Sequence, residues 1–137
     1  MDRYTVRDWM TANPVTISPQ TSLADAHRLM KQKKVRRLPV VEGDKLVGIV
    51  ALSDILEAEP SQATTLSIYE LNYLLAELKV EKIMKRPVIT VTPDTTIREA
   101  ANLMLTHKIG GLPVMEGGRL VGIITESDIF RMIVRVT

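Results

Sequence analysis

The stretch that decides the fold occurs twice, first as Leu38-Pro39-Val40-Val41-Glu42-Gly43-Asp44-Lys45-Leu46-Val47-Gly48-Ile49 and, 74 residues later, as Leu112-Pro113-Val114-Met115-Glu116-Gly117-Gly118-Arg119-Leu120-Val121-Gly122-Ile123. The same shift superimposes Val6–Leu56 on Val80–Phe130 without a gap. A repeat of about 50 residues buries too little apolar surface to be stable alone. We therefore expect the two copies to share one core and to be related by a pseudo-twofold axis with two related clefts.

Each copy changes its hydrophobic pattern in the same order. Short β-branched runs at 15–17 and 89–91 predict a strand that a following proline stops. Apolar residues at helical spacing come next, namely Leu23, Ala26, Leu29 and Met30 in the first copy and Ile97, Ala100, Leu103 and Met104 in the second. A glycine-containing pair, Gly43-Asp44 or Gly117-Gly118, then predicts a β-hairpin, because the favoured two-residue turns need positive φ. A short helix is expected to begin near Ser53 and Ser127.

These elements predict an α+β fold of two β-α-β-β-α repeats, packed about the pseudo-twofold axis through their sheets. The first repeat is expected over residues 1–60 and the second over residues 80–137. Between them, residues 61–79 should form a linker loop and a helix that begins at the capping box of Ser67 and Glu70. The leucines of this helix would serve core packing or a dimer seam, and they are Leu71, Leu74, Leu75 and Leu78.

The composition is that of an ordinary soluble globular protein, with 45% hydrophobic residues, 25% charged residues and a net charge of +2. The chain has no cysteine, which excludes disulfides, thiol nucleophiles and thiolate metal sites. The start of the chain lacks the apolar core of a signal peptide, and no apolar run approaches the roughly 20 residues of a membrane span. We therefore expect a cytoplasmic protein without a membrane partner.

The sequence offers little support for catalysis, metal binding or nucleic-acid binding. It has no nucleophile–base pair, paired-carboxylate signature or phosphate loop, so an enzyme is not expected. His27 and His107 occupy different repeat positions and have no second ligand at metal spacing, so no metal site is expected. The basic stretch Lys31–Arg37 could contact nucleic acid, but almost no aromatic residues accompany it for base stacking.

The doubled elements resemble a pair of cystathionine-β-synthase-type (CBS) domains, the tandem also called a Bateman module. The resemblance rests on Met10–Pro14, on the Leu-Pro-Val strands and their hairpins, and on Gly-h-h-x-x-Ser-Asp at the third strand of each copy, where h is apolar. Residues 64–75 are also similar to the linker of acetoin-utilisation-type CBS proteins. The resemblance implies that an adenosine-bearing ligand, such as AMP, ADP, ATP or S-adenosylmethionine, binds in clefts between the repeats. It also implies a homodimer and a regulated protein partner.

In the ribose signature of the family, Gly-h-h-(Thr/Ser)-x-x-Asp, the Asp carboxylate accepts hydrogen bonds from the ribose hydroxyls. Residues 122–128 fit this signature fully, whereas residues 48–54 have Ala51 in place of the hydroxyl residue. The resemblance therefore favours one cleft, whose residues would be Thr125, Ser127, Asp128, Met10, Val15, Val35, Arg36 and Arg37. The two arginines are forked donors that match phosphate oxygens.

The second cleft would contain Ser53, Asp54, Met84, Ile89, Ile109 and Gly110. Gly110 and Gly111 replace the two arginines there, so this cleft should take a less anionic ligand or none. Two plainer interpretations stay open. Thr125 and Asp128 also form a helix-capping pattern, and a structural oligomerisation module with empty clefts would need no ligand.

Overall fold

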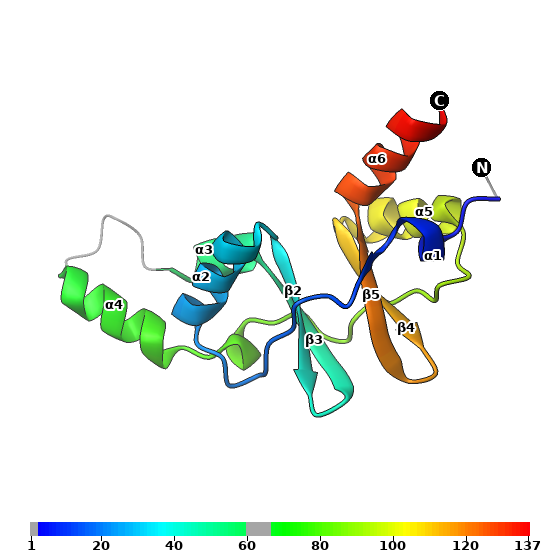
Figure 1. Ribbon diagram of the computed structural model, residues 1–137. Coiled ribbons are helices and arrows are strands. Elements are labelled where there is room, and N and C mark those ends of the chain that lie inside the picture. The colour runs from blue at the N-terminus through cyan, green and yellow to red at the C-terminus, as the bar shows by residue number, and fades with distance from the viewer. Residues whose placement is uncertain (1–2, 60–66) are drawn as a thin grey trace. The chain divides into compact units, whose positions relative to one another are not determined.

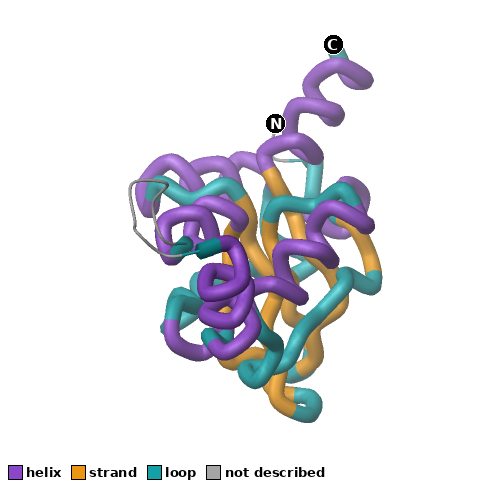
Figure 2. The backbone as a smooth tube through the Cα atoms, turned by 90° about the vertical axis from the view of Figure 1, so that its left-hand side faces the viewer, coloured by secondary structure: helices purple, strands orange, loops and turns teal. Residues whose placement is uncertain are grey.

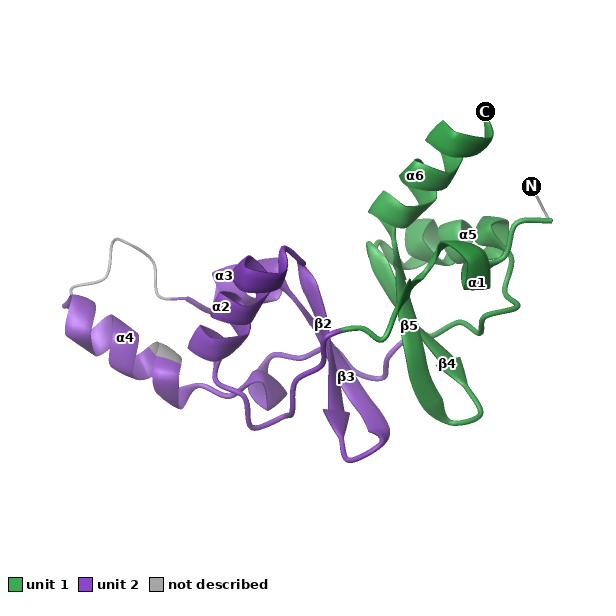
Figure 3. Cartoon of the chain, viewed as in Figure 1, with its two compact units in different colours: residues 1–14, 89–137 green, residues 15–88 purple. Residues whose placement is uncertain are grey.

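The computed structural model describes residues 3–59 and 67–137. These residues form two compact units, unit 1 of Met1–Pro14 with Ile89–Thr137 and unit 2 of Val15–Val88 (Figure 3). Neither unit coincides with one sequence repeat. Unit 1 combines most of the second repeat with the first residues of the first repeat, and unit 2 includes the first residues of the second repeat. Most of the linker loop expected before Ser67 lies outside the described residues.

Unit 2 is built on an antiparallel hairpin with helices before and after it (Figure 1). Its elements are α2 (Leu23–Lys33), β2 (Arg37–Glu42), β3 (Lys45–Ala51), α3 (Leu52–Ala58), α4 (Ile68–Glu77) and the 3-10 helix η1 (Val80–Lys82). The capping box predicted for the linker helix is present, because Ser67 Oγ accepts from Glu70 N at 3.2 Å and Glu70 Oε1 accepts from Ser67 N at 3.5 Å.

Unit 1 repeats this hairpin and adds a third strand, in the order β1-β5-β4. Its elements are α1 (Val6–Trp9), β1 (Thr11–Ala12), α5 (Ile97–His107), β4 (Gly111–Glu116), β5 (Arg119–Thr125) and α6 (Glu126–Val136). Short loops join most of these elements (Figure 2). The helix and strand content confirms the α+β class, and α6 is longer than the short helix expected at Ser127. Among the described helices, none is long and apolar enough to cross a membrane.

Both predicted hairpins are confirmed, and their registers correspond position by position. Gly43 has φ +62° and Gly117 and Gly118 have φ +58° and +79°, which a residue with a side chain rarely adopts. Each hairpin contains a register shift at the same place, between Val40 and Val41 and between Val114 and Met115. The duplicated sequence therefore produces a duplicated local structure.

The strands expected at residues 15–17 and 89–91 do not form, and this prediction was wrong. Each run makes one isolated parallel bridge, Ile17 with Val40 and Val91 with Val114. In the first copy, Ile17 N donates to Pro39 O at 3.1 Å and Val41 N donates to Ile17 O at 2.8 Å. A longer ladder would need N–H groups from Pro39 and Pro19, and proline has none. The equivalent prolines of the second copy, Pro113 and Pro93, set the same limit.

Residues 4–12 belong to unit 1 because backbone hydrogen bonds join them to it and Val6 is buried in its core. Val6 N donates to Thr95 O at 2.8 Å and Ile97 N donates to Tyr4 O at 2.8 Å. The Arg7 guanidinium donates to Glu116 at 3.2 Å and to Asp94 at 3.3 Å. These two carboxylates raise the pKa of Arg7 above its usual value.

Nearly all buried apolar residues of the described chain form two clusters, one in each unit, and not the single shared core expected from the repeat length. The cluster of unit 1 includes Val6 of the first repeat, which is 0% exposed. The cluster of unit 2 includes Val80 and Met84 of the second repeat. Each cluster thus gains apolar side chains from the other repeat, which supplies burial that one repeat of this length lacks.

Candidate functional site

Asp128 lies at the junction of β5 and α6, where its carboxylate accepts three hydrogen bonds. Thr125 N donates to Oδ2 at 2.9 Å and Thr125 Oγ1 donates to the same oxygen at 3.1 Å. Arg131 Nη1, one turn along the helix, donates to Oδ1 at 2.9 Å. The side chain of Asp128 is only 6% exposed. Asp128 therefore does cap the start of α6 through Oδ2, as the capping interpretation predicts. The other oxygen, Oδ1, takes no part in the cap.

Asp54 occupies the equivalent junction of β3 and α3 and accepts fewer hydrogen bonds from the described residues of its unit. Ala51 N donates to its Oδ2 at 2.9 Å, and Ala51 has no hydroxyl to add a second bond. Its Oδ1 lies 3.7 Å from Lys85 Nζ. The side chain of Asp54 is 13% exposed and that of Lys85 is 72% exposed. A carboxylate can accept about four hydrogen bonds, so with respect to residues 15–59 and 67–88 Asp54 keeps more acceptor capacity than Asp128 does in unit 1.

Two short segments, residues 10–12 and 84–85, each pair with a strand of the opposite repeat; we call them the leading segments. Thr11 pairs with Ile123 of β5. Lys85 exchanges two backbone hydrogen bonds with Ile49 of β3, at 2.8 and 3.2 Å. The predicted site residue Met10 therefore lies in the same unit as Thr125, Ser127 and Asp128.

The second leading segment does the same in unit 2, where it brings Met84 together with Ser53 and Asp54. The methionine of each segment crosses a glycine of the neighbouring strand. A Cβ added to Gly48 would lie 2.5 Å from Met84 Sδ, and one added to Gly122 would lie 2.6 Å from Met10 Sδ. Only glycine at these two positions allows so close an approach.

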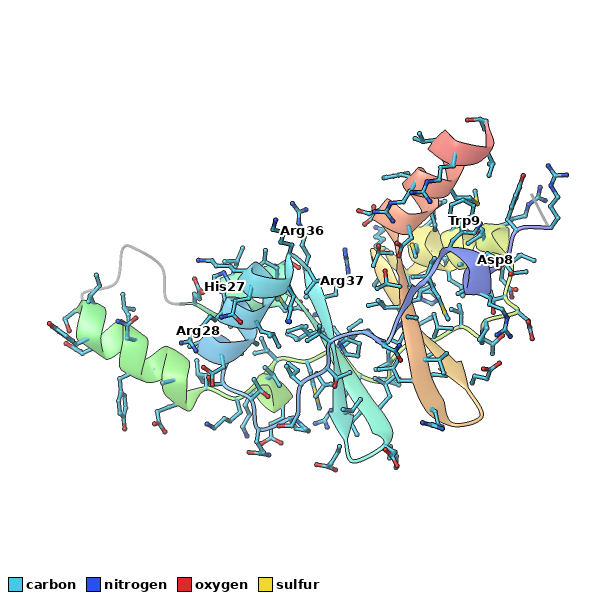
Figure 4. The ribbon with its side chains drawn as sticks, viewed as in Figure 1. Asp8, Trp9, His27, Arg28, Arg36 and Arg37 are labelled. Carbon is cyan, nitrogen blue, oxygen red and sulfur yellow. The ribbon has the colours of Figure 1, made fainter. Side chains whose placement is uncertain are left out.

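The remaining predicted residues are divided between the units. Unit 2 holds Val15, Val35, Arg36 and Arg37, and unit 1 holds Ile89, Ile109 and Gly110. Arg36 O accepts from Leu52 N at 2.8 Å, and Gly110 O accepts from Glu126 N at 3.0 Å. Arg36 and Arg37 follow α2 at the start of the hairpin (Figure 4). The structure thus places the predicted site residues in two groups, one in each unit.

Sequence reasoning missed two cations, Lys85 and Arg131. Both are visible when the repeats are superimposed, because Lys85 corresponds to Thr11 and Arg131 corresponds to Glu57. Neither belongs to the ribose signature, so the signature alone does not indicate them.

Of the two histidines, His27 lies beside Glu59, with Nδ1 3.3 Å from Oε1. Within residues 3–59 and 67–137, no three acidic, histidine or cysteine side chains are grouped so as to hold a metal ion.

Comparison with known proteins identifies both repeats. The family model described as "CBS domain" matches residues 6–61 and 80–135. AcuB from Vibrio cholerae is 35% identical in a structure that matches 96% of this chain and 91% of that chain, with a TM-score of 0.79. CBSX2 in complex with AMP is 33% identical, with 97% and 98% of the two chains covered and a TM-score of 0.79.

A third solved structure is the CBS domain pair of protein MJ0100 in complex with 5′-methylthioadenosine and S-adenosyl-L-methionine. It is 29% identical, covers 97% of this chain and 98% of that chain, and gives a TM-score of 0.80. Several curated relatives are much longer than this chain. The chain spans 21%, 44% and 46% of the length of the first three curated relatives that it matches.

Proposed function

Because the chain belongs to the CBS domain family, we propose that it is a regulatory module that binds an adenosine-bearing ligand, AMP, ADP, ATP or S-adenosylmethionine. The observation that carries the proposal is the nearly buried Asp128 carboxylate with Thr125 at the start of α6. Related CBS pairs in complex with AMP or S-adenosyl-L-methionine support it. We propose no catalytic role for the chain and place it in the cytoplasm.

In the proposed site, Asp128 accepts hydrogen bonds from the ribose hydroxyls through the oxygen turned away from its cap. Thr125 keeps the carboxylate in place, and Ser127 is exposed on the first turn of α6, near the positive end of the helix dipole. Met10 supplies an apolar contact beside β5. Val15 and Val35 would contact the purine, and Arg36 and Arg37 would contact the phosphate, which are roles predicted from the sequence.

The second proposed site contains Ser53, Asp54 and Met84 in unit 2. Ile89, Ile109 and Gly110 of unit 1 would complete it, as the sequence predicts. Its carboxylate lacks the hydroxyl bond that Thr125 gives to Asp128. One chain is thus expected to bind up to two ligands with different affinities.

Isothermal titration calorimetry tests the proposal with AMP, ADP, ATP and S-adenosylmethionine. The informative variants are Asp54→Asn and Asp128→Asn, because asparagine keeps an oxygen for the cap bond from residue 51 or 125. Loss of the carboxylate charge should weaken binding at the altered site about tenfold, since hydrogen bonds to ionised groups are roughly twice as strong as neutral ones. If no ligand produces heat with the wild-type protein, the proposal is wrong.

Ligand binding would act by a population shift. A ligand that binds one conformation better than another favours that conformation by its difference in affinity. The partner that responds would be a regulated protein or a second copy of the chain. Exposed apolar side chains on α6 favour the homodimer, and they are Phe130 at 61%, Ile133 at 40% and Val134 at 78% exposed.

Exposed apolar side chains on α6 and on α4 also support a second candidate function, an assembly module whose sites hold no ligand. On α4, Ile68, Tyr69 and Tyr73 are 71%, 84% and 66% exposed. Sedimentation of the wild-type protein and of Phe130→Asp separates the two functions when nucleotide is added. An assembly module would dissociate in the variant and show no response to nucleotide. Nucleic-acid binding gains no support, because Lys31 and Lys33 lie in the last turn of α2, where the helix dipole favours cations.

A further inference from the structure

The two signature carboxylates differ in the cation that meets their outward oxygen. In both units Oδ2 is held by a backbone N–H, from Ala51 or Thr125, at 2.9 Å. At Asp128, Oδ1 is bonded to Arg131 at 2.9 Å, whereas at Asp54 it faces Lys85 at 3.7 Å. We propose that Lys85 makes the Asp54 site selective for adenosine ligands that carry a 5′-phosphate; this inference rests on the proposed function.

Lys85 is held at its backbone, whereas its side chain is exposed and makes a long ion pair with Asp54. Its N–H and C=O are both bonded to Ile49, so its Cα holds one place beside β3. Met84, the preceding residue, is buried against Gly48 and anchors the segment further. The Lys85 side chain is 72% exposed. Its ammonium group can therefore exchange one anionic partner for another without movement of the strand.

The distance between Lys85 and Asp54 leaves room for that exchange. Charge-assisted N–H···O bonds are about 2.7–2.9 Å long, so 3.7 Å is an ion pair without a tight hydrogen bond. Because the Lys85 end of the pair is 72% exposed and screened by solvent, the pair contributes little stability. A ribose diol that donates to Asp54 Oδ1 would displace the ammonium at small cost. The 5′-phosphate on the same sugar would then accept the released ammonium as a new partner.

Unit 1 offers the opposite arrangement. Arg131 reaches Asp128 from the same helix, three residues along, and the Thr125 hydroxyl takes a further acceptor position. The leading segment there carries Thr11, an uncharged residue, at the position of Lys85. The leading segment of unit 1 therefore gives Asp128 no cation for a phosphate. This departs from the sequence expectation, which assigned the less anionic ligand to the cleft of Asp54.

The proposal is tested by placing the residue of the first leading segment at the equivalent position of the second. Calorimetry on the full chain compares AMP with adenosine, in the wild-type protein and in Lys85→Thr, which places the residue of the first leading segment in the second. Lys45→Thr is the matched control, because it removes the same charge from an exposed position at the start of β3. Asp54→Asn identifies which binding event belongs to the Asp54 site, since it removes only that carboxylate.

The wild-type protein and Lys45→Thr should prefer AMP to adenosine at the Asp54 site. Lys85→Thr should reduce this preference by about tenfold, which is the loss of one charge-assisted contact, while its affinity for adenosine stays within about twofold. If Lys85→Thr keeps the wild-type preference, Lys85 is not the determinant even though the proposed function stands. If neither AMP nor adenosine binds the wild-type protein while ADP, ATP or S-adenosylmethionine does, this inference fails and the proposed function stands. If none of these ligands binds, the proposed function itself fails.

Discussion

Replacement of Gly122 by alanine should destabilise the protein more than the same replacement at Gly48. The two positions are equivalent in the repeats and in the two hairpins. The three atoms nearest to an alanine Cβ at Gly48 would all belong to the side chain of Met84, with Sδ at 2.5 Å, Cγ at 2.8 Å and Cβ at 3.2 Å. At Gly122 the Cβ would meet Met10 Sδ at 2.6 Å and also the backbone oxygen of Thr11 at 2.9 Å. A side chain can rotate away, whereas a backbone oxygen moves only with its strand.

The expected magnitudes follow from these contacts. A methionine forced off its preferred rotamer costs about 0.5–1.5 kcal/mol. Alanine restricts the unfolded chain relative to glycine and so contributes about 0.4–1 kcal/mol of stability. Gly48→Ala should therefore lower the free energy of unfolding by about 1 kcal/mol or less. Gly122→Ala adds a backbone shift of the overpacking kind, about 1–3 kcal/mol, and its total should be near 2 kcal/mol.

Urea denaturation of both variants measures the difference, and methionine truncation supplies the control. In a Met84→Ala background, Gly48→Ala should cost much less, because Met84 Sδ and Cγ are removed and, of the three nearest atoms, only Met84 Cβ at 3.2 Å remains. In a Met10→Ala background, Gly122→Ala should still be destabilising, because Thr11 O remains. The reasoning is refuted if Gly48→Ala costs as much as Gly122→Ala, or if Met10→Ala fully relieves Gly122→Ala.

Three further predictions concern stability. Lys108→Gly should raise the free energy of unfolding by about 1 kcal/mol, because Lys108 holds φ +55° after α5 and only glycine adopts this conformation without cost; a loss of stability in urea denaturation would contradict this. Arg7→Ala should lower the melting temperature at low salt and less so in 1 M salt, since its bonds to Asp94 and Glu116 are exposed and screened by ions; an equal loss at both salt concentrations would exclude an electrostatic cause. Residues 15–88 expressed alone should unfold more cooperatively than the equally long 6–79, because only the first fragment contains both Val80 and Met84 of the unit 2 core; equal circular-dichroism transitions would show that these side chains are dispensable.

Local structure was predictable where a single stretch of sequence contains the whole cause. The hairpins at Gly43 and Gly117 were predicted from a turn that needs positive φ, and α2 and α5 from apolar spacing on one helix face. The failed strand at 15–17 also has a local cause. Its ladder needs an N–H from Pro39, a residue that the sequence shows plainly, so the register of the partner strand was the missing information.

The units themselves depend on contacts that no local pattern specifies. Val6 is buried with residues about 100 positions away in the chain, and Val80 is buried with the first repeat. Periodicity assigns both residues to their own repeats, since it has no information on which repeat buries them. The same limit applies to the site. The ribose signature contains Asp54 and Asp128, but the cations Lys85 and Arg131 reach them across space or from one turn away.

The glycine of the ribose signature and the methionine of the leading segment together position the leading segment against the strand. Glycine at 48 and 122 lets a methionine of the opposite repeat approach the strand closely, and the next residue, Lys85 or Thr11, then pairs with that strand. In unit 2 this places the Lys85 ammonium 3.7 Å from the signature carboxylate. That next residue is exposed and bears little on the core, so it can change without loss of the fold. The chain has Thr11 in one copy and Lys85 in the other, at a position where the backbone is held and the side chain is not. A duplicated fold can in this way acquire two sites of different ligand preference while the glycine–methionine contact is kept in both copies.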